Sequence, residues 1–350
     1  MNTTQTQTNT IKQAVYTGIG GPEVMQIVEK PLPEPGPGQA RVRVLTAGVA
    51  FADLMVRFGT YPSPPPPGSP LGYDIVGIVD KLGEGVASLR EGQMVGALLP
   101  HFGGYTETAV VPEEWLVPLP DGVDPAEAVC LILNYLTAVQ MLEEMADAQP
   151  GEKLLIHSAA GGVGTAVLQL GRLKNLEMYG TASAGKHELV ADLGATPIDY
   201  RNEDFGERIR QLAPDGLDIV LDPIGGDTMT RSYKLLRRGG RLVSFGLLTA
   251  REGDKSAFLP NLMKIAVRKL WPDGRKIMFN RGLPPYTEKH NDWYRDTLAR
   301  LFTLLQEGQI QPVIGAKLPL DDIARAHELL ENGAVSGKIV LYTAACEKTV

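Results

Sequence analysis

The sequence has few cysteines and no long apolar run. Its cysteines, Cys130 and Cys346, lie far apart and form no C-x-x-C pair, which excludes a four-cysteine zinc site and suits a reducing compartment. No window carries about 18 uninterrupted apolar residues, so a membrane-spanning helix is not expected. The first residues, MNTTQTQTNTIK, are polar and lack the apolar core of a secretory signal. These absences predict a cytoplasmic protein.

An excess of positive charge is also missing. The net charge is −7, whereas a protein that binds phosphate backbones needs a basic face, so a general affinity for nucleic acid is not expected. Hydrophobic residues make up 43% and charged residues 21% of the chain, which is typical of a folded globular protein. A length of 350 residues suggests about two domains.

The first third of the chain has a β-like pattern. Between residues 12 and 130, short apolar runs such as VRVLTAG, DIVGIVDKLG and ETAVVP are separated by Gly, Pro and Asp, which predicts an antiparallel barrel or sandwich. YPSPPPPGSP, residues 61–70, cannot form a central strand or a helix, because proline removes donors and fixes φ. A proline-binding module could recognise such a run, but a stiff loop between two strands is the simpler interpretation.

From residue 134 to 311 strands and helices alternate. KLLIHSA, EMYGTAS, DIVLDPIGG and RLVSFG are apolar strand candidates, and GTAVLQLGRLK and HELVADLG are helix candidates, the second ended by Gly194. Strands that are apolar at every position and joined by helices predict a doubly wound parallel sheet. The tail from residue 312 returns to a helix and a strand and is expected to rejoin the first domain. We therefore predict one domain from residues 1–133 and 312–350, and a second from 134–311.

A glycine-rich turn, AAGGVGTA at residues 159–166, follows the strand candidate LLIH. The spacing Ala159-x-Gly161-x-x-Gly164 is a variant of the dinucleotide fingerprint. The fingerprint needs a tight turn, then a residue without a side chain where the pyrophosphate approaches, and finally a small residue for close helix packing. A tight turn without a ligand is the alternative. The strand before it and the helix after it favour a dinucleotide.

The end of the next strand candidate indicates which dinucleotide binds. A chain that binds NAD places an acid about 20 residues further on, but here Ser183 stands there and Lys186 follows. A hydroxyl and an ammonium group would bind a 2′-phosphate that a carboxylate would repel, so NADPH is favoured. Glu177 is the competing acid, but it lies at the start of the strand. A solvated Lys186 at a helix start is the alternative for the lysine.

With these features in place, the chain resembles the medium-chain dehydrogenase/reductase superfamily. It is most similar to the zinc-free quinone oxidoreductase branch, including the vesicle amine transport protein-like members. The segments that carry the resemblance are GVAFADLMVRFGTYP, NYLTAVQML, HSAAGGVGTAVLQL, YGTASAGKHE, IDYRNEDF, DPIGG and LVSFG. The resemblance implies a chaperonin-10-like catalytic domain, a Rossmann domain and a cleft between them.

The resemblance also implies site residues. The cofactor contacts it implies are Thr137, Gly161, Gly162, Val163, Gly164, Ser183, Lys186, Tyr200, Ile224, Phe245 and Gly246. Tyr200 is similar to a tyrosine beside the 2′-phosphate; taken alone, it would be a surface tyrosine after a strand. The candidates for the substrate pocket are Phe51, Asp53, Tyr61 and Asn134. Asp53 could equally accept loop N–H groups as a structural residue.

The expected chemistry uses no metal. Zinc-dependent relatives place a Cys and a His where this chain has Ala50 and Tyr73, and a catalytic zinc needs about three protein ligands. The histidines form no H-x-x-x-H pair and are interpreted as surface or helix residues. Quinone reductases often have Asn where Ala50 stands, an amide that can approach the nicotinamide, and its absence leaves the substrate less defined than the cofactor.

Without a Lewis acid, we expect NADPH-dependent reduction of a quinone or an α,β-unsaturated carbonyl, because their products spread the developing charge. A different class is a cofactor-binding sensor or scaffold with weak turnover and a protein or membrane partner. Residues 266–280, AVRKLWPDGRKIMFN, are compatible with a contact surface or a lid. The resemblance implies a homodimer, and an open sheet needs its edge covered; the edge strand is expected within residues 241–282.

Overall fold

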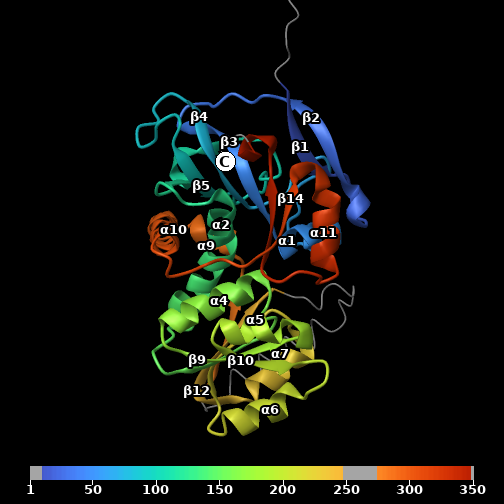
Figure 1. Ribbon diagram of the computed structural model, residues 1–350, viewed down its shortest axis with the longest axis vertical. Helices are drawn as coiled ribbons and strands as arrows, with labels where there is room; N and C mark the ends of the chain where they lie inside the picture. The colour runs from blue at the N-terminus through green and yellow to red at the C-terminus, as the bar shows by residue number, and fades with distance from the viewer. Residues whose placement is uncertain (1–9, 247–273, 348–350) are drawn as a thin grey trace, which may run out of the picture.

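The computed structural model describes residues 10–246 and 274–347, and these form two lobes (Figure 1). The upper lobe combines the early segments, in blue and cyan, with the last segments, in red. The lower lobe contains the middle of the chain, in green to orange. The described chain therefore starts and ends in the same lobe.

The upper lobe is built mainly of β-strands. A hairpin of β1 (Thr10–Tyr16) and β2 (Met25–Pro31) accompanies a seven-stranded sheet. The order in that sheet is β14 (Ile314–Pro319), β15 (Lys338–Tyr342), β3 (Gln39–Val49), β4 (Asp74–Leu82), β5 (Met94–Leu98) and β7 (Leu116–Pro118), with β6 (Thr108–Pro112) also paired to β3. β15 pairs antiparallel with β3, so the end of the chain completes a sheet that the first strands begin.

The lower lobe contains a six-stranded sheet in which every pairing is parallel. Its order is β10 (Ala195–Asp199), β9 (Glu177–Ala182), β8 (Lys153–Ile156), β11 (Leu217–Asp222), β12 (Leu236–Phe245) and β13 (Lys276–Asn280). Numbered from β8, this is the order 3-2-1-4-5-6 of the Rossmann fold. The prediction of a doubly wound parallel sheet is confirmed.

The core of this sheet follows from its sequence. All six positions of β11 are buried, as expected for a strand covered on both faces. The crossover helices are α4 (Gly162–Leu173), α5 (His187–Asp192), α6 (Phe205–Leu212) and α7 (Gly226–Tyr233). Gly194, just beyond α5, has φ +90°, a conformation that glycine adopts at no steric cost, and it ends the helix as predicted.

A long helical stretch, Pro125–Met145, joins the two lobes (Figure 1). It consists of α2 (Pro125–Cys130), a π-helical turn at Leu131–Tyr135, α3 (Leu136–Val139) and a second π-helical turn at Gln140–Met145. Within the described residues, this stretch alone is long and apolar enough to cross a membrane, and 78% of its apolar window is buried inside the molecule. The predicted boundary at residues 133 and 134 falls within it and stays a prediction.

The remaining helices cover the upper lobe and its junction with the lower one. They are α1 (Phe51–Arg57), α9 (Leu283–Thr287), α10 (Asn291–Gln306), α11 (Ile323–Glu331) and α12 (Ala344–Glu347). Residues 61–70 form neither helix nor strand apart from a bridge at Pro70, which confirms the proline-rich loop. Of the segment 266–280, residues 266–273 lie outside the described residues, and 276–280 form β13.

Candidate cofactor and substrate site

The predicted cofactor residues gather at one edge of the parallel sheet. All of them except Thr137 lie at or just after the carboxyl ends of strands β8 to β12. In an open parallel sheet, ligands bind outside the carboxyl ends of the strands, where the strand order reverses. Here the reversal lies between β8 and β11, and the glycine-rich turn follows β8. The edge therefore brings together residues that are up to 85 positions apart along the chain, from Gly161 to Gly246.

Two glycines in the turn have different surroundings. A Cβ on Gly164 would lie 2.4 and 2.5 Å from the carbonyl oxygens of Ser158 and Ala159, so the close approach of α4 to the strand requires glycine there. Gly161 has an extended backbone, with φ −79° and ψ 174°, and a Cβ there would contact only the Ser158 oxygen, at 3.2 Å. Packing therefore explains Gly164 but explains Gly161 poorly. The backbone at Gly161 is therefore open on the side where its Cβ would lie.

Asn134 approaches this turn from the long helical stretch, and Thr137 lies about one helical turn further along that stretch. A Cβ on Gly162 would lie 2.4 Å from Asn134 Nδ2, so the amide lies directly against the start of α4. Asn134 is 6% exposed, and its side chain has no hydrogen-bond partner in the part of the chain that the structure describes. Thr137 Oγ1 donates to the Leu133 carbonyl at 2.6 Å. The Asn134 amide is therefore available to a ligand beside the turn.

Lys186 contacts the other lobe. Its Nζ donates to the carbonyl oxygens of Gly333 and Val335, at 3.0 and 2.7 Å. The same segment reaches the glycine-rich turn, because Gly337 N donates to Ala160 O at 2.8 Å. Burial, with a smaller contribution from nearby Arg201, lowers the pKa of Lys186. An ammonium group has three donors, so one remains for a phosphate after the two carbonyls are bound.

Tyr200 and Ser183 lie near Lys186 at the same sheet edge. Tyr200 is 53% exposed, and the guanidinium carbon of Arg201 is 5.7 Å from the centre of its ring. Ser183 precedes the turn that carries Lys186 and makes no capping hydrogen bond. Arg201 was not among the predicted residues, although a basic residue directly after Tyr200 was a visible signal. The edge thus presents two cationic side chains close to each other.

On the substrate side, the Asp53 carboxylate is hydrogen-bonded to other parts of the protein. It is fully buried, and its carboxylate accepts hydrogen bonds from Ala50 N at 2.8 Å, Gly72 N at 3.0 Å and the Tyr105 hydroxyl at 2.7 Å. Burial raises the pKa of Asp53 to about 6 against the opposing effect of these donors. This geometry supports the structural alternative for Asp53, which ties α1 to the residues before β4. Phe51, the first residue of α1, is partly exposed.

Tyr61 belongs to an aromatic cluster that the sequence did not predict. Its hydroxyl shares a short hydrogen bond with the hydroxyl of Tyr73. Phe102 packs on both, with ring centres 5.4 Å from Tyr61 and 4.2 Å from Tyr73. Tyr61 is partly exposed, whereas Tyr73 is 2% exposed. In the sequence, Tyr73 stands out only as the residue at a zinc-ligand position. Its hydrogen bond to Tyr61 joins residues 12 positions apart, which no local pattern indicates.

One histidine, His157, corrects the sequence interpretation, whereas His327 lies in a helix as expected. His157 was expected at the surface or in a helix, but it is buried just after β8 and hydrogen-bonds to Thr181 at 3.0 Å and Ser232 at 2.8 Å. The run of apolar strand residues before it carries it into the interior, where two hydroxyls satisfy its ring. His327 is in α11 and is also buried. Over residues 10–246 and 274–347, no three His, Cys, Asp or Glu side chains form a group that could hold a metal.

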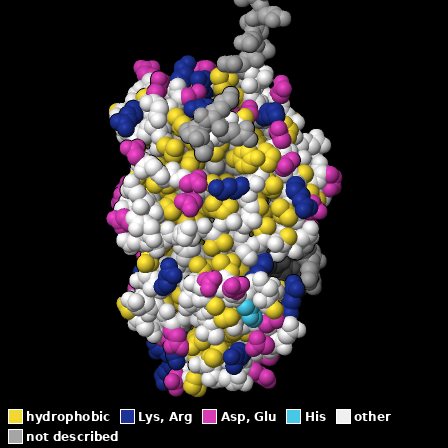
Figure 2. Space-filling model, viewed as in Figure 1, with side chains coloured by type: hydrophobic (Ala, Val, Ile, Leu, Met, Phe, Trp, Pro, Cys, Tyr) yellow, Lys and Arg dark blue, Asp and Glu magenta, His cyan; other side chains and the backbone are white. Residues whose placement is uncertain are grey.

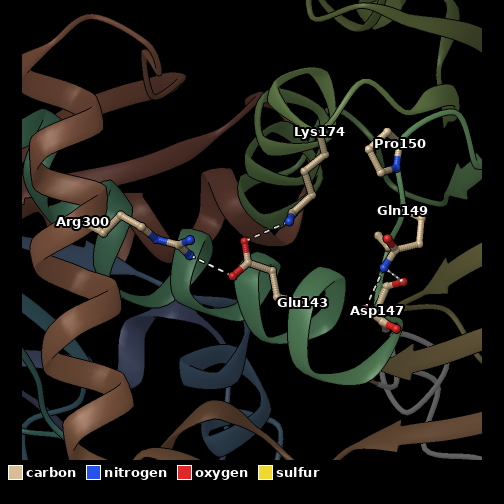
Figure 3. Close-up of a pocket in the computed structure, with 7 residues that line it drawn as sticks. Glu143, Asp147, Gln149, Pro150, Lys174 and Arg300 are labelled. Atoms are coloured by element: carbon tan, nitrogen blue, oxygen red, sulfur yellow. Dashed lines mark hydrogen bonds and ion pairs between the residues drawn. The ribbon is translucent and has the colours of Figure 1, made fainter.

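A polar pocket of about 380 Å³ lies at the far end of α4. Glu143 lies between Lys174 and Arg300 in this pocket, at 3.2 and 2.9 Å (Figure 3). Burial alone would raise the pKa of Glu143, but the two cations lower it. Lys174 follows the last residue of α4, about 18 Å along the helix from the glycine-rich turn. The charges of Glu143, Lys174 and Arg300 are therefore paired with one another, and this pocket is separate from the candidate site.

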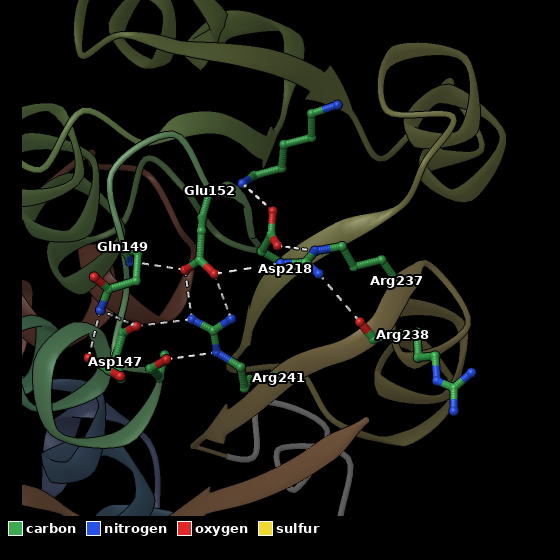
Figure 4. Close-up of polar contacts among 9 residues, drawn as sticks. Asp147, Gln149, Glu152, Asp218, Arg237, Arg238 and Arg241 are labelled. Atoms are coloured by element: carbon green, nitrogen blue, oxygen red, sulfur yellow. Dashed lines mark hydrogen bonds and ion pairs between the residues drawn. The ribbon is translucent and has the colours of Figure 1, made fainter. Parts of the chain in front are cut away.

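A second charged cluster lies at the amino ends of the strands. Arg241 donates to both carboxylate oxygens of Glu152, at 2.8 and 2.6 Å, and to the Ala146 carbonyl at 2.7 Å (Figure 4). Arg237 pairs with Asp218 nearby (Figure 4). Bidentate arginine pairs are the geometrically specific ones. This cluster anchors the end of the long helical stretch to the sheet, on the edge opposite the cofactor residues.

Comparison with known proteins gives the family. Residues 36–121 match the alcohol dehydrogenase GroES-like domain, and residues 193–341 match the zinc-binding dehydrogenase family. The human synaptic vesicle membrane protein VAT-1 homolog is 34% identical over 338 residues, which cover 93% of this chain and 85% of that protein. The quinone oxidoreductase of Pseudomonas aeruginosa is 33% identical over 94% of this chain and 99% of its own length. The chain belongs to the medium-chain dehydrogenase/reductase superfamily.

Solved structures agree with this assignment. The quinone oxidoreductase of Pseudomonas syringae pv. Tomato DC3000 has a TM-score of 0.83 at 30% identity, and covers 95% of this chain and 99% of its own. The Escherichia coli quinone oxidoreductase complexed with NADPH has a TM-score of 0.82 at 29% identity, with the same coverage. The fold is a GroES-like domain joined to a Rossmann domain, as predicted, and the protein is an oxidoreductase of the quinone oxidoreductase type with a nicotinamide cofactor.

Proposed function

We propose that the protein is a zinc-independent, NADPH-dependent oxidoreductase that reduces a quinone or an α,β-unsaturated carbonyl. The observation that carries the proposal is the open backbone at Gly161, beside a strand end that presents Ser183 and Lys186 and no acid. NADPH, when bound, supplies the hydride. The chain's own residues bind and orient the reactants and exclude water.

The proposed cofactor residues bind different parts of NADPH, according to their position along the sheet edge. Backbone N–H groups at the start of α4 face the pyrophosphate, since the first turn of a helix has unpaired donors. Lys186, with Ser183 and Tyr200, receives the 2′-phosphate. Ile224, Phe245, Gly246 and Thr137 complete the proposed cofactor contacts, and Val163 lies between the glycines of the turn. The NADPH complex of the E. coli relative supports this choice of cofactor.

The choice of acceptor follows from the groups available to it. Hydride addition to an ordinary ketone forms a localised alkoxide, which needs a metal or a strong donor. Ala50 and Tyr73 stand where zinc-dependent relatives have ligands, and Asp53 is fully occupied by its three donors. A quinone or an enone forms a phenolate or an enolate instead, which needs weaker stabilisation. We therefore propose that Phe51, Tyr61 and Asn134 act mainly by positioning the acceptor.

Steady-state oxidation of NADPH and NADH with a quinone and an enone tests this proposal. We expect turnover with both acceptors and a preference for NADPH. Equal kcat/KM for the two cofactors would contradict the assignment of Ser183 and Lys186. Stoichiometric zinc in the purified protein, together with activity lost to a chelator, would contradict the metal-free chemistry.

A second candidate is a cofactor-binding sensor or scaffold, which the 34% identity to a synaptic vesicle membrane protein homolog favours. In this case NADPH would bind tightly but would be consumed slowly with every acceptor, and the protein would act through a protein or membrane partner. Brisk turnover in the same assay selects the enzyme. In either role we propose a cytoplasmic location. Figure 2 shows basic and acidic side chains interspersed over one face, so that face offers no extended basic patch for nucleic acid.

We also propose a homodimer. β13 (Lys276–Asn280) pairs with β12 and is at the edge of the six-stranded sheet, within the range where an edge strand was predicted. Phe279 on this strand is 41% exposed. Exposed strand edges favour pairing with another chain. Light scattering at micromolar concentration should report twice the chain mass of 37.8 kDa, and a monomer would contradict the proposal.

A further inference from the structure

The Tyr61–Tyr73 pair is fixed in position by the residues around it. Leu99 N donates to Tyr73 O at 2.6 Å, and Gly72 N, one residue earlier, donates to Asp53 at 3.0 Å. Phe102 adopts a left-handed backbone, with φ +65°, which is uncommon for a bulky residue. Its ring lies 4.2 Å from that of Tyr73. The loop thus accepts an unfavourable backbone conformation where it covers this tyrosine.

The number of hydroxyl protons in the Tyr61–Tyr73 pair shows which tyrosine donates the hydrogen bond between them. The pair has two O–H groups, and one of them forms the hydrogen bond between the rings. No other acceptor contacts the Tyr73 hydroxyl within residues 10–246 and 274–347. If Tyr61 were the donor, Tyr73 would keep an unpaired proton in a buried position, which is costly. Tyr73 therefore donates to Tyr61, and the proton of the partly exposed Tyr61 remains free.

We propose that Tyr73 is a positioning residue that directs the Tyr61 hydroxyl, so that Tyr61 donates a hydrogen bond to the carbonyl oxygen of the acceptor. This inference rests on the proposed function, because it names the group that binds the acceptor oxygen. A hydroxyl that accepts one hydrogen bond becomes a better donor in the next, because hydrogen-bonded chains polarise one another. Tyr73 thus strengthens and aims a donor that it does not itself present to the substrate.

Tyr73 donates a hydrogen bond but does not give up its proton. Burial, with the hydrogen bond to Tyr61 as a smaller cause, raises the pKa of Tyr73 well above its ordinary value, so it stays neutral throughout the working range of pH. The proton that completes an enol or a hydroquinone comes from water. The contribution of the pair is therefore the modest one of a neutral donor, which suits an activated acceptor.

A double-mutant cycle of Tyr61→Phe and Tyr73→Phe tests the inference, because each change removes one hydroxyl and keeps its ring. We measure kcat/KM with 1,4-naphthoquinone and, separately, the shift in its absorption spectrum on binding to the protein. We expect Tyr61→Phe to lower kcat/KM about three- to tenfold, as for a neutral hydrogen bond. Tyr73→Phe should lower it about threefold in the parent and have no effect in the Tyr61→Phe background.

Tyr294→Phe is the matched control. The Tyr294 hydroxyl is also fully buried, but it accepts from Leu98 N and donates to Trp115 O, away from the pair. Its loss should lower the melting temperature and leave the spectral shift of the bound quinone unchanged. A Tyr73→Phe variant that behaves in the same way would overturn the inference.

The outcomes separate this inference from the proposed function. Turnover of the quinone with equal effects of Tyr73→Phe in both backgrounds would overturn the role of Tyr73 and leave the function intact. Binding without turnover, with a spectral shift that Tyr61→Phe and Tyr73→Phe each reduce, would support the pair and overturn the function. A parent protein that gives no spectral shift and no turnover would overturn both.

Discussion

The cofactor side and the substrate side of the candidate site are built differently. The cofactor side is mostly backbone, provided by glycines and strand ends along one edge of a parallel sheet. The substrate side is mostly side chains that meet from separate loops, such as Tyr61, Tyr73 and Phe102. A site made of backbone tolerates little change in residue size. A site made of side chains should lose function in small steps.

Variants of two glycines in the turn should give the largest effects. One should lose affinity for NADPH, and the other should lose stability. Gly161→Ala meets only one atom of the protein, so we expect near-parental stability but an NADPH affinity about 100-fold lower, equivalent to one lost charge-assisted hydrogen bond. Gly164→Ala forces a Cβ against two backbone oxygens, so the protein itself should lose about 1 to 3 kcal/mol of stability. Thermal unfolding and cofactor titration of both variants make the comparison. Equal stability losses would contradict the assigned roles.

The buried carboxylate at the end of β11 gives the next effect. Asp222 Oδ1 accepts from Ile224 N and Gly225 N, while Oδ2 has no partner and is buried. Burial raises the pKa of Asp222 to about 6 from 3.8. The folded state therefore binds the proton more tightly than the unfolded state, and this residue's contribution to stability is lost as the pH rises from about 4 to about 6.

Asp222→Asn removes this titration and keeps the accepting oxygen. The variant should match the parent near pH 4 and be more stable by about 1 to 3 kcal/mol near pH 8. Urea unfolding at the two pH values measures the difference. Burial lowers the pKa of His157 to about 3, so its effect on stability has the opposite pH dependence. Because His157 is present in both proteins, this effect cancels in the difference between the variant and the parent. A difference that does not change with pH would contradict the account of Asp222.

Lys186→Ala tests the charged part of the cofactor side. Loss of one charge-assisted hydrogen bond costs about 1.5 to 3 kcal/mol, so NADPH should bind roughly tenfold or more weakly while NADH is hardly affected. The variant also removes the two hydrogen bonds to the segment at Gly333 and Val335. Titration with NADH controls for that loss of contact between the lobes. If both cofactors weaken equally, the lysine serves the lobes and not the phosphate.

Tyr61→Ala should give the smallest effect on binding and sharpen the distinction between the two sides. We expect kcat/KM for a quinone to fall at least as far as in Tyr61→Phe, while the Kd for NADPH stays within about twofold, since the tyrosine belongs to the acceptor. Steady-state kinetics and cofactor titration on the same preparation measure both values. A larger change in the NADPH Kd than in kcat/KM would place Tyr61 on the cofactor side.

The cofactor side consists mostly of backbone and the substrate side mostly of side chains, and this difference also explains which parts of the site the sequence could predict. The turn at residues 159–166 and the strand ends at Ser183 and Lys186 follow from local patterns, because each strand carries its own exit loop to the common edge. The contact of Lys186 with Gly333 and the bond between Tyr61 and Tyr73 depend on how distant segments pack. The prediction for His157 was wrong for the same reason, since only the folded sheet places Thr181 and Ser232 beside its ring.

The most direct test of the proposed chemistry pairs a conjugated enone with its saturated ketone at equal concentration, with NADPH. Positioning can contribute about 7 to 11 kcal/mol in favourable cases, which is enough for an activated acceptor but leaves an ordinary ketone without stabilisation of its alkoxide. We predict that the enone turns over and the saturated ketone does not. Comparable kcat/KM for the two would show that a carbonyl-activating group is present and would contradict the proposal.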